Sequence, residues 1–277
     1  MPDADTRKTV EATMSYLVPT EEKPISASYG PENTLHTHTG TYADHVVRIR
    51  DARGERASHV LDREGFRLAD HATAVGDFYD EEEVRAVYYP ELEALVKAET
   101  GCACVFIFDH TRRAGTEEIR EACKVRGPVR HVHNDYTEWS GPQRLRDMMG
   151  DEAEDLLKKR FQVIQVWRGV RGPVLSSPLG IIDARSIAPE DLIITERNYP
   201  NRRGEIYHLA WNPDHQWSYF PEMARDEALV FKCYDSRKDV ARFTAHCAFT
   251  DPATPADAPP RESIEARMLA FFDEDAA

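Results

Sequence analysis

The chain has 277 residues, 41% of them hydrophobic, and a net charge of −14 from 49 acidic and 35 basic residues. This acidity repels phosphate backbones and anionic lipid, so nucleic acid and membrane partners are not expected. The N-terminal stretch lacks the segments of a secretion signal, and no run approaches 18 apolar residues. Five cysteines without a C-x-x-C pair indicate reduced thiols. We therefore expect a cytoplasmic protein.

The first part of the chain is expected to be an irregular N-terminal arm over residues 1–41, because it is rich in Thr, Pro and Gly. The alternation of apolar and charged residues in "HVVRIRDAR" (45–53) then predicts a half-buried strand. Residues 79–101, "YDEEEVRAVYYPELEALVKAETG", begin with acids, keep apolar residues at helical spacing and end in Gly. These are the signals of an amphipathic helix.

From residue 102 onward, short β-like runs alternate with Gly, Pro and Asn turns, as in "FQVIQVWRG" (161–169) and "ALVFKCYDS" (228–236). One further helix is expected over 141–161. Many short strands at such spacing predict a sandwich or barrel. Because no internal repeat or linker is evident, we expect one domain over 1–277. Lys232 and Asp235 are expected to pair within this fold.

The segment "RHVHNDYTEW" (130–139) concentrates histidines and acids in ten positions. In a strand, alternate side chains share a face, so His131, His133 and Asp135 could point the same way. Two histidines and one carboxylate leave positions on Fe(II) open for substrate and dioxygen. The His133-x-Asp135 pair alone is weak evidence, because a hydrogen-bonded His–Asp pair on a surface strand would have the same sequence.

A distal histidine and an arginine strengthen the metal hypothesis. His246 lies in the apolar run "RFTAHCAFTDP", and "PRESIEAR" places Arg261 and Ser263 on one face of a later strand. A planar guanidinium suits bidentate capture of a carboxylate. The ordered set therefore predicts an anion clamp beside a metal.

Three residues remain alternatives for these roles. Arg267 shares a strand face with Arg261 and could be the clamp instead, although we favour Arg261 because Ser263 accompanies it. His208 in "EIYHLAWN" and His215 in "NPDHQW" are rival third ligands, with His246 favoured.

The sequence resembles the iron- and 2-oxoglutarate-dependent oxygenases with a double-stranded β-helix. More narrowly, it is similar to the cephamycin 7α-methoxylase hydroxylase component and to fungal gibberellin-desaturase-like hydroxylases. The resemblance runs from about residue 44 to the end and is carried by "DREGFRLADHATAVGDFYD", "YYPELEALVKAETG", "HVHNDYT", "VWRG", "SPLGIIDARSI", "HQWSYFPEMARDEALVFKCYDS", "AHCAFTDP" and "PRESIEAR". It implies a mainly β fold, with a jelly-roll core and flanking α-helices over residues 42–277.

The resemblance also implies roles for the candidate residues. His133, Asp135 and His246 would hold Fe(II), and Arg261 with Ser263 would hold the distal carboxylate of 2-oxoglutarate. Related sequences more often have Asn where this chain has Gln165, so the surroundings of the cosubstrate are expected to differ here.

We therefore expect a non-heme Fe(II)/2-oxoglutarate-dependent oxygenase that uses dioxygen to hydroxylate or desaturate a small-molecule substrate of secondary metabolism. A homodimer is compatible with the sequence. One alternative is a cupin-type dioxygenase or isomerase that uses His131, His133 and Glu138 without keto acid, although its second motif is missing. The other is a catalytically inactive binding protein of the same fold. The sequence does not identify the substrate.

Overall fold

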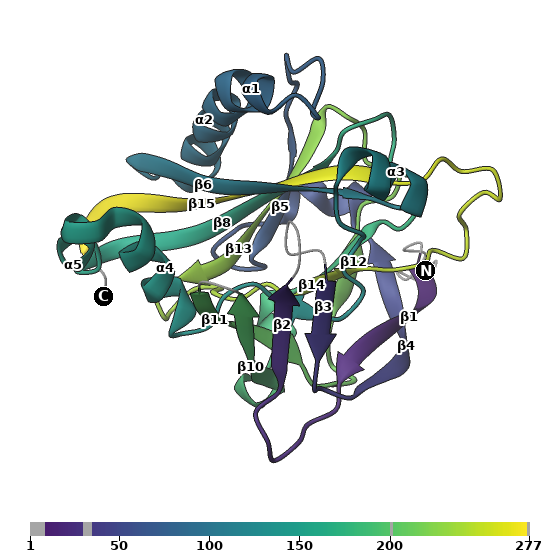
Figure 1. The fold of residues 1–277 in the computed structure, drawn as a ribbon, viewed down its shortest axis with the longest axis horizontal. Coiled ribbons are helices and arrows are strands. Elements are labelled where there is room, and N and C mark those ends of the chain that lie inside the picture. The colour runs from purple at the N-terminus through teal and green to yellow at the C-terminus, as the bar shows by residue number, and fades with distance from the viewer. Residues whose placement is uncertain (1–8, 30–34, 200–201, 276–277) are drawn as a thin grey trace, which may run out of the picture.

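The computed structural model describes residues 9–29, 35–199 and 202–275 and shows two β-sheets with helices at their edges (Figure 1). The expected mainly β fold with flanking helices is confirmed. In spatial order, the larger sheet contains β1 (Thr9–Leu17), β4 (Tyr42–Asp51), β12 (Trp217–Tyr219), β9 (Leu179–Ile182), β14 (His246–Ala248), β7 (His133–Asn134), β11 (Arg202–Leu209), β10 (Leu192–Tyr199), β2 (Ile25–Tyr29) and β3 (Leu35–His38). The smaller sheet contains β5 (Phe66–Asp70), β13 (Glu227–Asp235), β8 (Lys159–Gly169), β15 (Glu262–Asp275) and β6 (Cys104–Ala114).

Strand β8 shows how the small sheet is buried on both faces. Its Val163 and Trp167 join a core shared with Ile181 of the large sheet, whereas Ile164 and Val166 belong to a second core under the long helix. Side chains alternate between the faces of a strand, so consecutive apolar residues fill both layers. The same alternation in β15 decides which of its residues reach the space between the sheets.

The long helix begins with α1 (Glu81–Glu83), continues through a π-helical turn (Val84–Tyr88) and ends with α2 (Tyr89–Thr100). Asp80 caps its start by accepting hydrogen bonds from the backbone of Glu82 and Glu83. Gly101 ends it in the left-handed conformation, with φ 72°, as the sequence predicted. The buried face of this helix covers the outer face of the small sheet (Figure 1).

The expectation of an irregular arm over residues 1–41 is wrong for 9–29 and 35–41, which contain three strands, whereas 1–8 and 30–34 lie outside the described residues. Strand β1 pairs antiparallel with β4, and β2 pairs with β10 and β3. In β1 the alternate residues Ala12, Met14 and Tyr16 are buried against a core that includes Trp217 and Phe249. The alternation of these apolar positions with Glu11, Thr13 and Ser15 is the pattern of a strand with one buried face, but the expectation followed the Thr, Pro and Gly content of the whole segment instead.

The remaining helices border the sheets. Helices α4 (Ser140–Met149) and α5 (Ala153–Leu156), joined by a 3₁₀ turn, correspond to the helix expected over 141–161. Helix α3 (Glu117–Cys123) was not expected, although Thr116 caps it and two glutamates occupy its first turn. Within the described ranges, no helix is long and apolar enough to cross a membrane.

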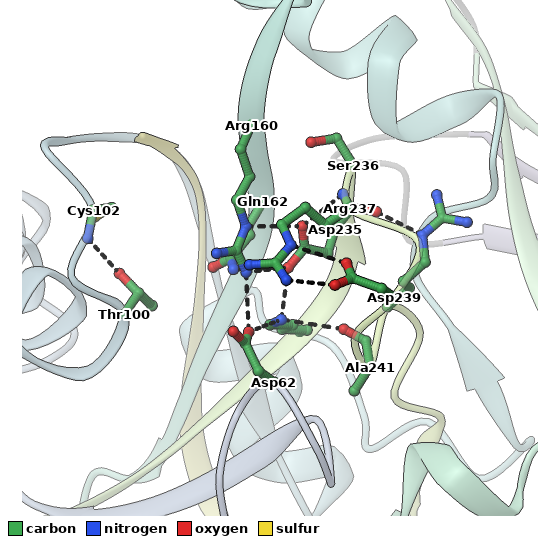
Figure 2. A network of polar contacts seen from close by, with 12 residues as sticks. Asp62, Thr100, Cys102, Arg160, Gln162, Asp235, Ser236, Arg237, Asp239 and Ala241 are labelled. Atoms are coloured by element: carbon green, nitrogen blue, oxygen red, sulfur yellow. Dashed lines mark hydrogen bonds and ion pairs between the residues drawn. The ribbon is translucent and has the colours of Figure 1, made fainter. Parts of the chain in front are cut away.

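A buried ionic network joins β8 and β13 (Figure 2). Lys232 Nζ lies 2.6 Å from Asp235 Oδ2, which confirms the expected pair. The β-bulge between Lys232 and Tyr234 brings these side chains to one face although they are three residues apart. Arg160 and Gln162 also donate to Asp235, at 2.9 and 2.8 Å. The network satisfies charges that would otherwise be costly to bury.

Candidate metal centre

His133 and His246 face each other across neighbouring strands. They are paired residues of the antiparallel strands β7 and β14, and their ring centroids lie 4.6 Å apart. Asp135 follows His133 by two residues, and ligand atoms of all three side chains lie within 4.8 Å of one another. Among the residues that the structure describes, this is the group of His, Cys, Asp and Glu side chains that could hold a metal ion.

The backbone orients both imidazoles. His133 Nδ1 lies 2.8 Å from the carbonyl oxygen of His131, and His246 Nδ1 lies 3.1 Å from that of Thr244. Because each Nδ1–H donates to the carbonyl two residues earlier, each Nε2 is left with a lone pair for a metal.

The electrostatics of the site favour the protonation states that bind metals. Burial and the nearby charge of His133 lower the pKa of His246 to about 4. Burial would raise the pKa of Asp135, but the neighbouring His133 and the positive charge of Arg267 outweigh that effect and hold this pKa well below its usual range. At neutral pH the site therefore offers a neutral imidazole of His246 and an ionised carboxylate.

Arg261 is buried beside this triad and lacks a full set of partners. Its Nη1 donates to the carbonyl of Ser177 at 2.7 Å, whereas its Nε and the hydroxyl of Ser263 have no hydrogen-bond partner in the described structure. Burial and then the charge of Arg113 lower the pKa of Arg261 to about 9, so the guanidinium remains charged at neutral pH. Unsatisfied buried donors of this kind fit an anionic ligand.

A small cavity of about 20 Å³ joins Arg261 to His133 and His246. This volume suits one end of a keto acid rather than the whole molecule. Arg113, Val129 and His133 also line the much larger cavity described below, into which the rest of such a ligand can extend. The residues present therefore fit Fe(II) and 2-oxoglutarate.

Arg267 has a different environment from Arg261, because acidic groups surround it. Its Nε lies 2.7 Å from Asp109 Oδ1, and its Nη1 lies 3.4 Å from Asp135 Oδ2 and 3.6 Å from Glu265 Oε1. Burial alone would lower its pKa, but these carboxylates raise it well above the usual value. Arg267 thus holds one oxygen of Asp135, while the other lies 3.5 Å from His133 Nε2.

Gln165 is buried in β8, where it pairs with Arg267 of β15 and Phe231 of β13 in the strand registers. Its amide oxygen accepts a hydrogen bond from the Cys233 thiol at 3.6 Å. This contact lies in the layer between the sheets.

The two rival third ligands lie outside the triad. His208 of β11 lies opposite His133 of β7, but the centroids of the two rings are 6.4 Å apart. The ring nitrogens of His208 instead contact the hydroxyls of Thr195 and Tyr42, at 2.9 and 3.3 Å. The nitrogens of His215 contact the Tyr16 hydroxyl at 3.1 Å and the Asp191 carboxylate at 3.0 Å.

The cupin alternative does not agree with the structure. The Glu138 carboxylate forms an ion pair with Arg242. His131 packs against Tyr42, with ring centroids 3.7 Å apart. Neither side chain belongs to the metal-binding group around His133.

Sequence reasoning did not identify the Arg113–Glu265 ion pair, whose atoms lie 2.8 Å apart beside Arg261. The sequence did contain a signal for Glu265. Ser263, Glu265 and Arg267 are alternate residues of β15, so their side chains share the inner face of this strand. The position of Arg113 follows only from the pairing of β6 with β15.

Two cavities lie beside the triad and share part of their lining. The inner cavity, of about 480 Å³, is lined by Ser26, His38, Tyr42, Arg113, Arg126, Gly127, Pro128, Val129, Arg130, His131, His133, Asp135, Arg197, Ile206, His208 and Arg267. The outer cleft, of about 410 Å³, is lined by Asp109, Thr111, Arg126, Asp135, Tyr136, Trp139, Ser140, Gln143, Arg144, Asp147, Arg197, Arg203, Gly204, Glu205, Ile206 and Arg267. Both linings include Asp135, so each cavity lies directly beside the triad.

Two histidines and one carboxylate inside a β-fold are the ligand types of the facial triad typical of non-heme iron oxygenases. A family described as "Oxidoreductase/YMDC permease-like domain" matches residues 14–271. The chain is 35% identical over 239 residues to the Fe(II)/2-oxoglutarate-dependent dioxygenase nvfI of Aspergillus novofumigatus, covering 83% of this chain and 84% of that protein. It is 34% identical over 259 residues to the hydroxylase/desaturase CTB9 of Cercospora beticola, covering 85% of this chain and 79% of that protein.

The structure of the iron and alpha-ketoglutarate-dependent endoperoxidase NvfI superimposes with a TM-score of 0.85 at 31% identity, covering 95% of this chain and 98% of that one. The chain belongs to the Fe(II)/2-oxoglutarate-dependent dioxygenases.

Proposed function

We propose that this protein binds Fe(II) through His133, Asp135 and His246 and uses 2-oxoglutarate and dioxygen to oxidise a small molecule of secondary metabolism. When bound, iron and keto acid supply an oxidant for C–H bonds as the keto acid is converted to succinate and CO₂. Hydroxylation or desaturation is the proposed outcome, supported by the relative named hydroxylase/desaturase. The narrower similarity to the cephamycin hydroxylase component, a single domain, a homodimer and a cytoplasmic location also remain proposals.

The observation that carries this proposal is the buried Arg261 Nε without a partner beside the triad. Arg261 and Ser263 would hold the distal carboxylate of 2-oxoglutarate through charge-assisted hydrogen bonds. Arg267 is better suited to hold Asp135, because carboxylates already surround it. Gln165 would help to shape the inner layer behind these groups.

The test is an anaerobic titration of the purified protein with Fe(II), followed by 2-oxoglutarate, and then an aerobic assay for succinate. We expect one iron and one keto acid per chain, with succinate formed on exposure to oxygen. Oxygen consumption without keto acid would instead support a cupin-type reaction. Absence of metal uptake would support a binding protein.

A further inference from the structure

Ser177 has a backbone conformation that its place in the sequence disfavours. Its φ is 47°, one of three positive values among the non-glycine residues that the structure describes. A side chain makes positive φ uncommon outside glycine. Ser177 also precedes Pro178, and the residue before a proline is usually extended. Contacts of Ser177 must offset this strain, and strained residues of this kind cluster at functional sites.

The carbonyl oxygen of Ser177 contacts the proposed keto acid clamp. It accepts a hydrogen bond from Arg261 Nη1 at 2.7 Å, although the two residues are 84 positions apart in the chain. Arg261 is buried and lines the small cavity beside His133 and His246. Its Nε has no partner in the described structure. The carbonyl of Ser177 therefore anchors one end of the guanidinium and leaves Nε available to a ligand.

The loop that carries Ser177 is itself held in place. Residues 170–178 connect β8 of the small sheet to β9 of the large sheet. The hydroxyl of Ser176 donates to the carbonyl of Pro259 at 2.7 Å, so this loop is fastened to the segment just before Arg261. The hydrogen bond from Arg261 to Ser177 thus ties the start of β15 to a supported loop.

The hydroxyl of Ser177 has a separate partner. It accepts a hydrogen bond from Arg130 Nη2 at 3.2 Å, while Arg130 Nη1 donates to the hydroxyl of Thr250 at 3.1 Å. Glycine would adopt the positive φ without steric cost but has no hydroxyl for Arg130. The backbone and the side chain of Ser177 therefore contact two different arginines, and substitutions can separate the two contacts.

We propose that Ser177 is a positioning residue for 2-oxoglutarate, because its carbonyl holds the guanidinium of Arg261 beside the small cavity. This inference rests on the proposed function, in which Arg261 binds the distal carboxylate of the keto acid. A guanidinium that is already held in place loses less conformational freedom when a carboxylate binds. A change in φ rotates the carbonyl of Ser177 relative to the preceding loop, so it should weaken keto acid binding.

The experiment compares Ser177→Pro with Ser177→Gly. Both variants lose the hydroxyl, but proline fixes φ near about −65°, whereas glycine can keep the positive value. Binding of 2-oxoglutarate is measured by calorimetry on the full chain loaded anaerobically with Fe(II), and iron affinity is measured on the same samples. We expect Ser177→Pro to weaken keto acid binding roughly 10-fold or more, as loss of a charge-assisted contact implies. Ser177→Gly should bind the keto acid like the wild type, and iron affinity should be unchanged in both.

Two further variants guard against an effect of folding alone. Glu222→Pro is the matched control, because Glu222 also has a positive φ, of 52°, but lies exposed in a turn. It should keep the wild-type affinity for 2-oxoglutarate. Ser177→Val has a branched side chain that disfavours positive φ, and it should show a smaller loss in the same direction as proline. The valine variant decides the question if Ser177→Pro does not fold.

Arg261→Ala separates this inference from the proposed function. If Arg261→Ala weakens keto acid binding but the folded Ser177 variant does not, the positioning role is overturned and the proposed function stands. If Arg261→Ala has no effect, the proposed clamp itself fails. Combining Ser177→Pro with Arg261→Ala should cause no loss beyond that of Arg261→Ala alone, because Ser177 acts through Arg261. Additive losses, or equal losses in the glycine and proline variants, would also overturn the inference.

Discussion

His133 and His246 are cross-strand partners whose imidazoles are oriented by the same local device, a hydrogen bond from Nδ1 to the carbonyl two residues earlier. The strand pairing sets the separation of the rings, and the carbonyls select the nitrogen that faces a metal. Backbone pairing of the strands holds these side chains in place, so substitutions can remove a ligand without removing the fold.

Replacing His133 or Asp135 with alanine should abolish stoichiometric Fe(II) binding and succinate formation. The fold should persist, because these side chains contribute to the cavity more than to the core. Anaerobic iron titration and circular dichroism measure the two effects. Unchanged iron affinity in both variants would contradict the ligand assignment.

The distal histidines should differ sharply in their effects. His246→Ala should reduce turnover to background, whereas His208→Ala should retain measurable iron binding, because its nitrogens already contact Thr195 and Tyr42. His215→Ala is the control for a buried histidine outside the cavities. If His208→Ala loses iron and His246→Ala keeps it, the third ligand must be reassigned.

Arg261→Ala should raise the apparent 2-oxoglutarate constant by roughly 30-fold or more, since losing one partner of a buried charged contact costs about 2–5 kcal/mol. Arg261→Lys should recover only part of this loss, because an ammonium lacks the planar fork. Arg267→Ala should instead weaken iron binding, because it releases one oxygen of Asp135. If Arg267→Ala, and not Arg261→Ala, raises the apparent 2-oxoglutarate constant strongly, then Arg267 is the keto acid clamp and Arg261 is not.

Asp235→Asn should destabilise the protein by about 3–5 kcal/mol, because Lys232 and Arg160 would lose a buried carboxylate. Urea unfolding measures this loss. The control is Asp155→Asn, which removes an exposed partner of Lys158 and should leave stability nearly unchanged. Similar losses in the two variants would show that the network adds little stability.

Acid should destabilise the metal-free protein partly through His59. Burial lowers the pKa of this imidazole, although Glu64 opposes the effect. The unfolded chain therefore takes up a proton first as pH falls below about 6.5, and folding stability decreases. Urea unfolding between pH 7.5 and 5.5, with a chelator present, should show a shallower pH dependence in His59→Phe. An unchanged slope would exclude His59 as a contributor.

The sequence predicted the parts of the fold that leave a local signal. The helix ending at Gly101 and the buried strand β8 have such signals in their periodicity and caps. The strands before residue 41 were missed although the alternation in Thr9–Leu17 was a strand signal, because the Thr, Pro and Gly content of the segment indicated irregular structure. Other features depend on how strands from distant segments are aligned, which the sequence does not show directly. The ion pair of Arg113 with Glu265 is one, because it forms only when β6 pairs with β15 in this register.

The candidate site was easier to predict than its supporting contacts. His133 and Asp135 lie two residues apart, so a short motif reveals them, and His246 lies in a recognisable apolar run. The different environments of Arg261 and Arg267 could not be predicted, because both share a strand face in the sequence. Contacts with distant segments distinguish them, because Arg261 donates to Ser177 whereas Arg267 pairs with Asp109 and Asp135.

The pairing of His133 with His246 has a consequence for the life of the protein in the cell. Their strands come from distant parts of the chain, so a newly synthesised polypeptide would lack the proposed iron site until the large sheet is assembled. Metal then stabilises only the native state, by about 2.7 kcal/mol when free iron is 100 times its dissociation constant. Chains made during iron shortage would unfold more often and be degraded sooner, so iron supply would set the abundance of the enzyme as well as its activity.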